Sequence, residues 1–315
     1  MILSSYLQES WLMHMNGILN VYKDKGMTSF DVVAQLRRIL NIRRIGHTGT
    51  LDPDATGVLP ICVGKATKVV DLLTNMNKTY RATLQLGIET DTQDISGTVL
   101  HQYHGEISVD DAKVHEVLMT FLGEYMQVPP MYSAIKKDGK RLYELARQGI
   151  EVEREPRLVH IFQIEQFTSL GNHCYRFDVT CSKGTYIRTL IHDLGQKLGY
   201  GACMTELIRT RVGEFNINDA LHIEAIKQAM LEQQLTTKLY SIESLFDECP
   251  KLIVSSEYDA CIHNGNKLSN VFVNQQVALN TIDITKNKRY RLYDSNERFV
   301  GLYVIDEQKD TPIFR

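Results

Sequence analysis

Residues 46–60 read GHTGTLDPDATGVLP, and this segment restricts the structure of the chain more than any other. Three glycines and two prolines interrupt it, so neither a helix nor a strand is expected to pass through it. Proline limits the freedom of the backbone, and Leu51 and Pro53 enclose Asp52. We therefore expect a rigid loop near the start of the chain that holds the Asp52 carboxylate in one position.

The composition of the chain is that of a globular protein with a full core. It has 315 residues, of which 43% are hydrophobic and 23% charged, which suits about two domains. No apolar run reaches about 18 residues, and Glu9 interrupts the opening segment, so neither a membrane span nor a signal peptide is expected. Six cysteines without metal-ligand spacing predict reduced thiols and a cytoplasmic protein. Residues 1–14 precede Met15, which stands directly before the first strand-like segment, and are read as an N-terminal extension.

Helical and alternating patterns follow one another irregularly along residues 15–249, which predicts an α+β domain around a mixed sheet. Thr28 and Asp31 form a capping box before a helix, and Ser108 and Asp111 resemble a second one, before a helix that ends at Gly123. Alternating apolar residues predict strands from 80 to 88 and from 175 to 181, and helices are expected at 189–199 and 222–235.

Pro250 marks the expected start of a second domain, residues 250–315. Three short strand-like runs, KLIVS, RYRLYD and FVGLYVID, are separated there by turn residues and predict a small β-rich module. The segment KNKRYR carries Lys286, Lys288, Arg289 and Arg291, a cluster suited to phosphate contact. The net charge of −3 does not by itself indicate a nucleic-acid binder, but local basic clusters decide phosphate contact.

Several chemistries could use the residues of the Asp52 loop. His47, Asp52 and Asp54 match no standard metal-ligand spacing, and Asp91 and Asp94 are better read as turn caps. The glycines do not form a phosphate-binding fingerprint. Glycoside hydrolysis needs two carboxyl groups, which Asp52 and Asp54 could supply, but nothing apolar surrounds Asp54 to make it an acid. A single carboxylate working with tyrosines and an arginine is the simpler interpretation.

A second constellation supplies those partners. In SKGTYIRT, Tyr186 and Arg188 stand two residues apart after a predicted strand, so both side chains can point the same way. An arginine beside Asp52 would keep it ionised and oriented. With Tyr80 at the start of another strand, these groups suit a flat base attached to a sugar. Taken singly, each tyrosine would be read as a core aromatic.

The segments GHTGTLDPDATGVLP, NKTYRATLQLG, MYSAIKKDGKRLYELARQG and CSKGTYIRTLIHDLG closely resemble the bacterial tRNA pseudouridine-55 synthase (TruB) family. The resemblance runs from about Asn16 to the end of the chain. It implies an α+β catalytic domain followed by a small PUA-like RNA-binding domain. It also implies isomerisation of uridine 55 in the T-arm loop of tRNA to pseudouridine, with no cofactor or metal, no guide RNA and no obligate protein partner.

The resemblance also assigns roles to individual residues. Asp52 is implied as the nucleophile, which either attacks C1′ or leads through a glycal, and Arg188 as its ion-pair partner. Tyr80 is implied to stack on the target uracil and to assist removal of its C5 proton. The implied substrate-binding residues are His47, Tyr186, Leu207, Lys23 and Arg209.

The chain departs from the family pattern at one position near the site. Asp24 stands in KDKG where the family usually has proline, which weakens the expected phosphate contact of Lys23. Three rival functions were considered: a relative that works with a guide RNA, a non-catalytic RNA-binding or RNA-folding protein, and a glycosidase that releases free uracil. Catalysis of the isomerisation is favoured by the joint presence of four residues: Asp52, Tyr80, Tyr186 and Arg188.

Overall fold

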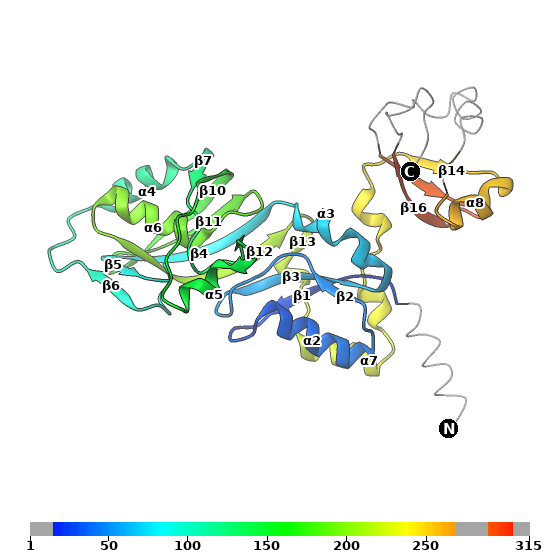
Figure 1. Ribbon diagram of the computed structural model, residues 1–315, viewed down its shortest axis with the longest axis horizontal. Coiled ribbons are helices and arrows are strands. Elements are labelled where there is room, and N and C mark those ends of the chain that lie inside the picture. Colours follow the sequence, from blue (N-terminus) through cyan, green and yellow to red (C-terminus); the bar gives the residue numbers. More distant parts are fainter. Residues whose placement is uncertain (1–14, 267, 269–288, 305–315) are drawn as a thin grey trace. The chain divides into compact units, whose positions relative to one another are not determined.

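The computed structural model describes residues 15–266, 268 and 289–304. The chain divides into two compact units, Met1–Leu239 and Tyr240–Arg315, and each is described by itself (Figure 1). Among the described residues, no helix is long and apolar enough to cross a membrane. All six cysteines are free, as their spacing predicts.

The first unit is built on a mixed nine-stranded sheet in the order β1-β3-β12-β4-β11-β10-β7, with β2 paired to β3 and β13 to β12. β3 and β12 pair in parallel, whereas the other neighbouring strands of this sheet are antiparallel. A mixed sheet with helices confirms the predicted α+β fold. The strands are β1 (Gly17–Lys23), β2 (Ile45–His47), β3 (Thr56–Val63), β4 (Lys78–Leu86), β7 (Gly123–Gln127), β10 (Arg157–Gly171), β11 (Cys174–Cys181), β12 (Ala202–Val212) and β13 (Phe215–Asn216).

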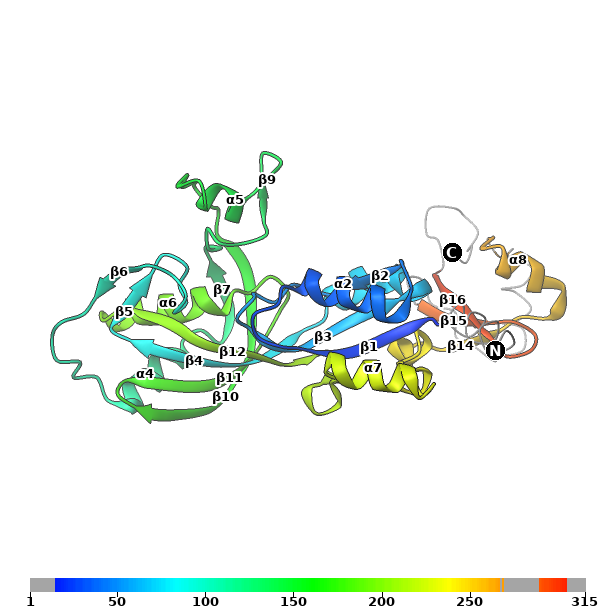
Figure 2. The ribbon, with the colours of Figure 1, turned by 90° about the horizontal axis from the view of Figure 1, so that it is seen from below.

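Short elements connect these strands. Two small hairpins pair β5 (Ile88–Thr90) with β6 (Val99–Gln102) and β8 (Lys136–Lys137) with β9 (Lys140–Arg141). Figure 2 shows β9 and α5 projecting from the sheet beyond β7. The short helices of this unit are η1 (Gly64–Val69), α3 (Val70–Thr74), α5 (Leu142–Ala146), η2 (Ile217–Asp219) and η3 (Leu235–Lys238).

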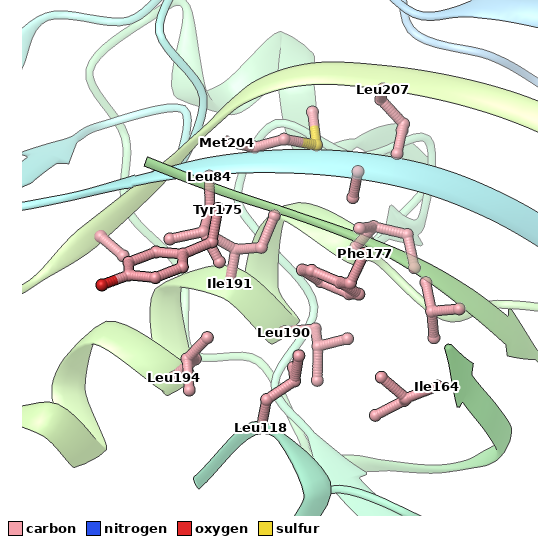
Figure 3. Packing of buried hydrophobic residues seen from close by; sticks show 14 of the residues in the cluster. Leu84, Leu118, Ile164, Tyr175, Phe177, Leu190, Ile191, Leu194, Met204 and Leu207 are labelled. Carbon is pink, nitrogen blue, oxygen red and sulfur yellow. The ribbon is translucent and has the colours of Figure 1, made fainter. Parts of the chain in front are cut away.

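One hydrophobic core lies between the middle of the sheet and α6 (Ile187–Leu198). Tyr175 and Phe177 of β11 are buried on the face that the alternating pattern predicts. Figure 3 shows them packed with Leu190, Ile191 and Leu194 of α6. The helix ends at Gly199, which adopts the left-handed conformation expected of a terminating glycine.

A second core lies under β1 and β3, where α2 (Ser29–Leu40) and α7 (Ile223–Leu231) pack side by side (Figure 1). The predicted capping box starts α2: the Thr28 side chain accepts from the Asp31 amide, and the Asp31 carboxylate accepts from the Thr28 amide. The loop with Asp52 lies between the two cores, because Leu51 and Ala55 belong to the first and Leu59 and Ile61 to the second.

Four local predictions were wrong. Residues 56–60 of the glycine and proline segment lie in β3, where Pro60 pairs with Asn20 of β1, so the loop is shorter than expected. Asp110, not Ser108, caps α4 (Asp111–Met119), since its carboxylate accepts from the Lys113 amide at 2.6 Å. α4 also ends before Gly123, which begins β7, and α7 ends at Leu231.

Gly57 is required by the parallel pairing of β3 with β12. It has a φ of +101°, and a Cβ atom there would lie 2.2 Å from the carbonyl oxygen of Arg209. We expect Gly57→Ala to lower the free energy of unfolding by about 3 kcal/mol or more, because the backbones must separate. Denaturant unfolding measures this. Gly139→Ala is the control, since φ is +82° but nothing lies within 4 Å of its Cβ. Equal losses in both variants would contradict the role of close approach.

The second unit contains a three-stranded sheet in the order β14-β15-β16. β14 (Lys251–Ile253) and β15 (Arg289–Tyr293) are parallel, and β16 (Phe299–Val304) is antiparallel to β15, so all three strand-like runs form strands. Its core includes Leu252, Leu292 and Tyr290. The helical elements here are η4 (Glu243–Phe246), η5 (Ser256–Tyr258) and α8 (Asp259–His263).

The basic segment KNKRYR is only partly described. Lys286 and Lys288 lie outside the described residues. Arg291 donates to the Asp247 carboxylate at 2.7 Å and to the Cys249 carbonyl at 2.9 Å, so its guanidinium is engaged within the unit. Arg289 is exposed. The boundary after residue 249 and the RNA-binding role of this module stay predictions.

Candidate active site

Hydrogen bonds hold the backbone on both sides of Asp52. The Leu51 amide donates to Ser29 Oγ at 2.9 Å, which ties the loop to the first turn of α2. The Pro53 carbonyl accepts from the Gly26 amide at 2.9 Å and from Lys23 Nζ at 3.0 Å. Asp52 therefore lies between two anchored neighbours, and the rigidity of the loop comes from these bonds together with its prolines.

Lys23 does not occupy the position predicted for it. Its side chain is fully buried, and Nζ donates to the carbonyls of Asp24, Met27 and Pro53 at 3.1, 2.6 and 3.0 Å. An ammonium has three donors, so none remains for an RNA phosphate. Burial lowers the pKa of Lys23 to about 8, against the opposing effect of the Asp52 and Asp54 carboxylates. The expected phosphate contact is corrected to a role in anchoring the loop.

Arg209 also lies inside the protein and not on a surface that RNA can reach. It is 1% exposed, and its guanidinium donates to the carbonyls of Val58 and Gly49 at 2.7 and 3.2 Å. It therefore joins β12 to Gly49 at the start of the Asp52 loop and to Val58 of β3. The prediction that Arg209 contacts the substrate directly is not met, because a buried guanidinium is held here by backbone acceptors.

Arg188 lies beside Asp52, as predicted. Its Nε is 3.0 Å from Asp52 Oδ2, and its side chain is 5% exposed. Nη1 donates to the Thr92 carbonyl at 2.8 Å and lies 3.5 Å from Asp94 Oδ2, and Nη2 donates to the Tyr132 carbonyl at 2.9 Å. Each nitrogen thus has its own partner, so the guanidinium has one orientation and presents Nε to Asp52.

The Asp52 carboxyl is reachable from solvent on one side, since 42% of its side chain is exposed. Burial of the remainder raises its pKa above that of an ordinary aspartate, and the Arg188 charge opposes this effect. Nearby Asp94 raises it further. The arginine is therefore the main charge that favours the ionised form of Asp52, and Lys23 adds a smaller effect in the same direction.

Tyr80 and Arg209 face each other across β4 and β12, where they are register partners. Tyr80 is half-buried, and this burial raises the pKa of its hydroxyl, whereas Arg209 opposes the rise. The phenol is accordingly protonated at neutral pH. Its ring borders the core that contains Leu51, so it lies on the same side of the sheet as the Asp52 loop.

Tyr186 and Arg188 reach the site from a helix and not from a strand. Tyr186 is the residue before α6, and Arg188 lies in its first turn, so the predicted strand spacing of two is wrong for them. Arg188 Nε nevertheless lies 3.0 Å from Asp52 Oδ2. Burial raises the pKa of the Tyr186 hydroxyl, and the negative charge of Asp52 adds a smaller rise. The approach of the α6 N-terminus to the loop brings them together.

Gln127 and Asp94 are site residues that the sequence did not reveal. Gln127 is 1% exposed, donates to the Tyr186 carbonyl at 2.9 Å and accepts from its amide at 2.8 Å. The side-chain amide of Gln127 thus makes the two hydrogen bonds that a backbone peptide of a neighbouring strand would make, although Gln127 is 59 residues away in the chain. Asp94 caps a turn as predicted, accepting from the Ser96 amide, and the same carboxylate also lies near Arg188.

His47 and Leu207 have different surroundings. His47 Nδ1 accepts from the Gly49 amide at 3.4 Å, and burial lowers the pKa of the imidazole, so the ring is neutral at pH 7. Its ring meets that of Phe30 edge to face, with centroids 5.2 Å apart. Leu207 is 8% exposed and packs in the core opposite Ala82. Its predicted contact with a base stays a prediction.

Metal ligation has little support in the described part of the chain, where no group of three or more His, Cys, Asp and Glu side chains could hold an ion. Asp54, the second carboxylate considered for glycoside hydrolysis, is exposed to solvent. It therefore lacks the apolar surroundings that raise the pKa of a catalytic acid. The site offers one carboxylate, its arginine and two tyrosines.

Family models match most of the catalytic unit. The model described as TruB family pseudouridylate synthase (N terminal domain) matches residues 37–187, and that of the tRNA pseudouridylate synthase B C-terminal domain matches residues 188–247. The chain belongs to the TruB family. It is therefore an isomerase of the tRNA pseudouridine synthase B group, and the resemblance noted in its motifs is confirmed.

Relatives in the TruB family match nearly the whole chain. A tRNA pseudouridine synthase B of Clostridium perfringens (strain SM101) is 45% identical over 294 residues, covering 93% of this chain and 96% of the relative. One of Lachnoclostridium phytofermentans is 48% identical over 303 residues, covering 94% and 97%. A chain in the crystal structure of a Cbf5–Nop10–Gar1 complex superposes with a TM-score of 0.69 at 26% identity, covering 97% of this chain and 85% of that one.

Gln127 offers a test of how this TruB-family site is held together. We expect Gln127→Leu to lower kcat by roughly tenfold, because the start of α6 loses its fixed position, and to lower the free energy of unfolding by about 1–3 kcal/mol. Initial rates and denaturant unfolding measure the two effects. Gln85→Leu is the control, since Gln85 also donates to a carbonyl, that of Asn172, but contacts no site residue. A kcat unchanged in Gln127→Leu would contradict the positioning role.

Proposed function

We propose that this enzyme isomerises uridine 55 in the T-arm loop of tRNA to pseudouridine. The observation that carries the proposal is the Arg188–Asp52 ion pair at 3.0 Å, in which Asp52 keeps 42% of its side chain exposed. A buried arginine fixed by three protein acceptors orients a carboxylate that a substrate can still reach. Membership of the TruB family supplies the reaction class.

The reaction moves a glycosidic bond from nitrogen to carbon. The target nucleotide leaves the RNA stack and enters the site, which costs a few kcal/mol. The bond between C1′ and N1 breaks, the uracil rotates, and a bond forms between C1′ and C5. The proton on C5 is then lost and N1 gains one, so substrate and product are isomers. No oxidant, reductant or cofactor enters this balance.

Each described residue has a part in this scheme. The Asp52 carboxylate acts on the sugar, either by attack at C1′ or by leading through a glycal, and Arg188 keeps it ionised. Tyr80 stacks on the uracil and assists removal of the C5 proton. Tyr186 contacts the flipped nucleotide, Leu207 borders the base, and His47 fills the space that the uridine leaves. Lys23 and Arg209 hold the loop and do not contact RNA.

Basic residues outside the site around Asp52 contribute to the binding of tRNA. Lys136, Lys137 and Lys140 are exposed on the β8–β9 hairpin, which projects from the sheet together with α5 (Figure 2). Such cations release counterions from RNA phosphates and supply much of the affinity. The second unit is assigned the role of a PUA-like RNA-binding module, and we propose that neither a guide RNA nor a partner protein is needed.

The test is to incubate the purified chain with an unmodified tRNA transcript and no other addition. Pseudouridine at position 55 and no free uracil is the expected result, and a transcript with cytidine at that position should remain unmodified. Pseudouridine at another position would overturn the site assignment. Free uracil would indicate a glycosidase, and a need for an added RNA or protein would indicate the guided type.

A further inference from the structure

Phe30 is an exposed aromatic residue near the Asp52 loop. Its side chain is 61% exposed, and among the described residues the other exposed phenylalanine is Phe162. Phenylalanine side chains are usually buried, although single exposed apolar residues are common on protein surfaces. An exposed phenylalanine suggests a function when it lies beside a candidate site. Phe30 occupies such a position, in the first turn of α2.

That position joins Phe30 to two parts of the active site. The preceding residue, Ser29, binds the Leu51 amide through its hydroxyl at 2.9 Å, so Phe30 is one residue from an anchor of the Asp52 loop. Its ring also meets the ring of His47 edge to face, at 5.2 Å and 88°. In an edge-to-face contact, the edge of one ring meets the face of the other, so at least one ring face is not covered by the partner ring. The 61% exposure of Phe30 indicates that much of its ring remains uncovered.

We propose that Phe30 is a substrate-binding residue, whose ring stacks on an unpaired tRNA base beside the extruded uridine. This inference rests on the proposed function. Extrusion breaks the stacking of the neighbouring bases, and an aromatic face beside the Asp52 loop compensates for that loss. His47 and Phe30 together then form a two-ring surface that receives the opened loop, while Asp52 and Tyr80 act on the extruded nucleotide.

Kinetics of Phe30→Ala on the tRNA transcript test the proposal. Loss of one base–aromatic stack weakens binding by roughly tenfold or more, so KM should rise by that factor while kcat stays within about twofold. The salt dependence of binding should keep its slope, since no phosphate contact is lost. Phe30→Trp should restore KM, and Phe30→Leu should not, because leucine is apolar but has no ring to stack.

Phe162→Ala is the matched control. Phe162 is 47% exposed and packs against His160 of its own strand, away from the Asp52 loop. A T-arm hairpin with 2-aminopurine next to the target uridine adds a direct readout, since stacking quenches its fluorescence. Wild type and Phe30→Trp should quench it, and Phe30→Ala should not.

The outcomes separate this inference from the proposed function. If wild type makes no pseudouridine at position 55, the proposed function fails whatever Phe30 does. If wild type is active but Phe30→Ala leaves KM and the quenching unchanged, the stacking role is wrong. A fall in kcat alone would also overturn it, because Phe30 would then act through the position of His47. If Phe30→Leu restores KM to the wild-type value, an apolar side chain is sufficient and the proposed stacking role is wrong.

Discussion

Asp52→Asn abolishes turnover while tRNA affinity stays within about one order of magnitude of the wild type. Asparagine has nearly the same shape as aspartate and can still accept a hydrogen bond from Arg188, but it carries no charge for attack on the sugar. Removing a group that forms bonds in the reaction costs on the order of 10⁴-fold or more in kcat. Affinity persists because it depends mainly on contacts with phosphates, which lie outside this carboxylate.

Single-turnover assays on a tRNA transcript and a filter-binding titration measure the two quantities for Asp52→Asn. The matched control is Asp54→Asn, which removes an exposed carboxylate two residues away and should keep most of the activity. Substantial turnover by Asp52→Asn would exclude Asp52 as the catalytic group. Equal loss in both variants would instead revive a mechanism with two carboxylates, as in glycosidases.

Arg188→Met lowers kcat/KM by roughly 100-fold or more, because Asp52 loses the group that orients it. It also changes the pH dependence. Asp52 must be ionised to react, and burial already raises its pKa above that of an ordinary aspartate, while the Arg188 charge opposes that rise. Activity therefore falls as pH falls through this pKa. Without the arginine the pKa rises further, so the acid limb of the profile moves to higher pH.

A pH profile of kcat/KM for wild type, Arg188→Met and Arg188→Lys measures this shift. Lysine keeps the charge but cannot reproduce the separate bonds to the carbonyls of Thr92 and Tyr132, so its acid limb should lie between the other two. Arg176→Met is the control, because Arg176 forms an exposed ion pair with Glu206. An acid limb that stays in place in Arg188→Met would show that another group sets it.

Local patterns in the sequence determined most of the secondary structure and singled out the loop that carries Asp52. The capping box at Thr28 and the alternation in β11 depend on residues close in sequence, so they are readable without a fold. The prediction failed where two neighbouring residues could both cap the same helix: Asp110, and not Ser108, caps α4. The glycine and proline segment likewise indicated a constrained loop around Asp52, although its end belongs to β3.

The tertiary structure alone decided which charged residues near the Asp52 loop are buried. The family resemblance implied that Lys23 and Arg209 contact RNA. Lysine and arginine are usually exposed, yet both residues are buried here and donate to backbone carbonyls of the Asp52 loop or next to it. These acceptors come from segments 30 and 160 residues away in the chain, and no local pattern records them. The same holds for Gln127, which reaches Tyr186 across 59 residues. Long-range hydrogen bonds of this kind form only once the fold brings β3, β7, β12 and α6 together. The sequence therefore indicated the proposed catalytic group, Asp52, and the fold determined what holds it.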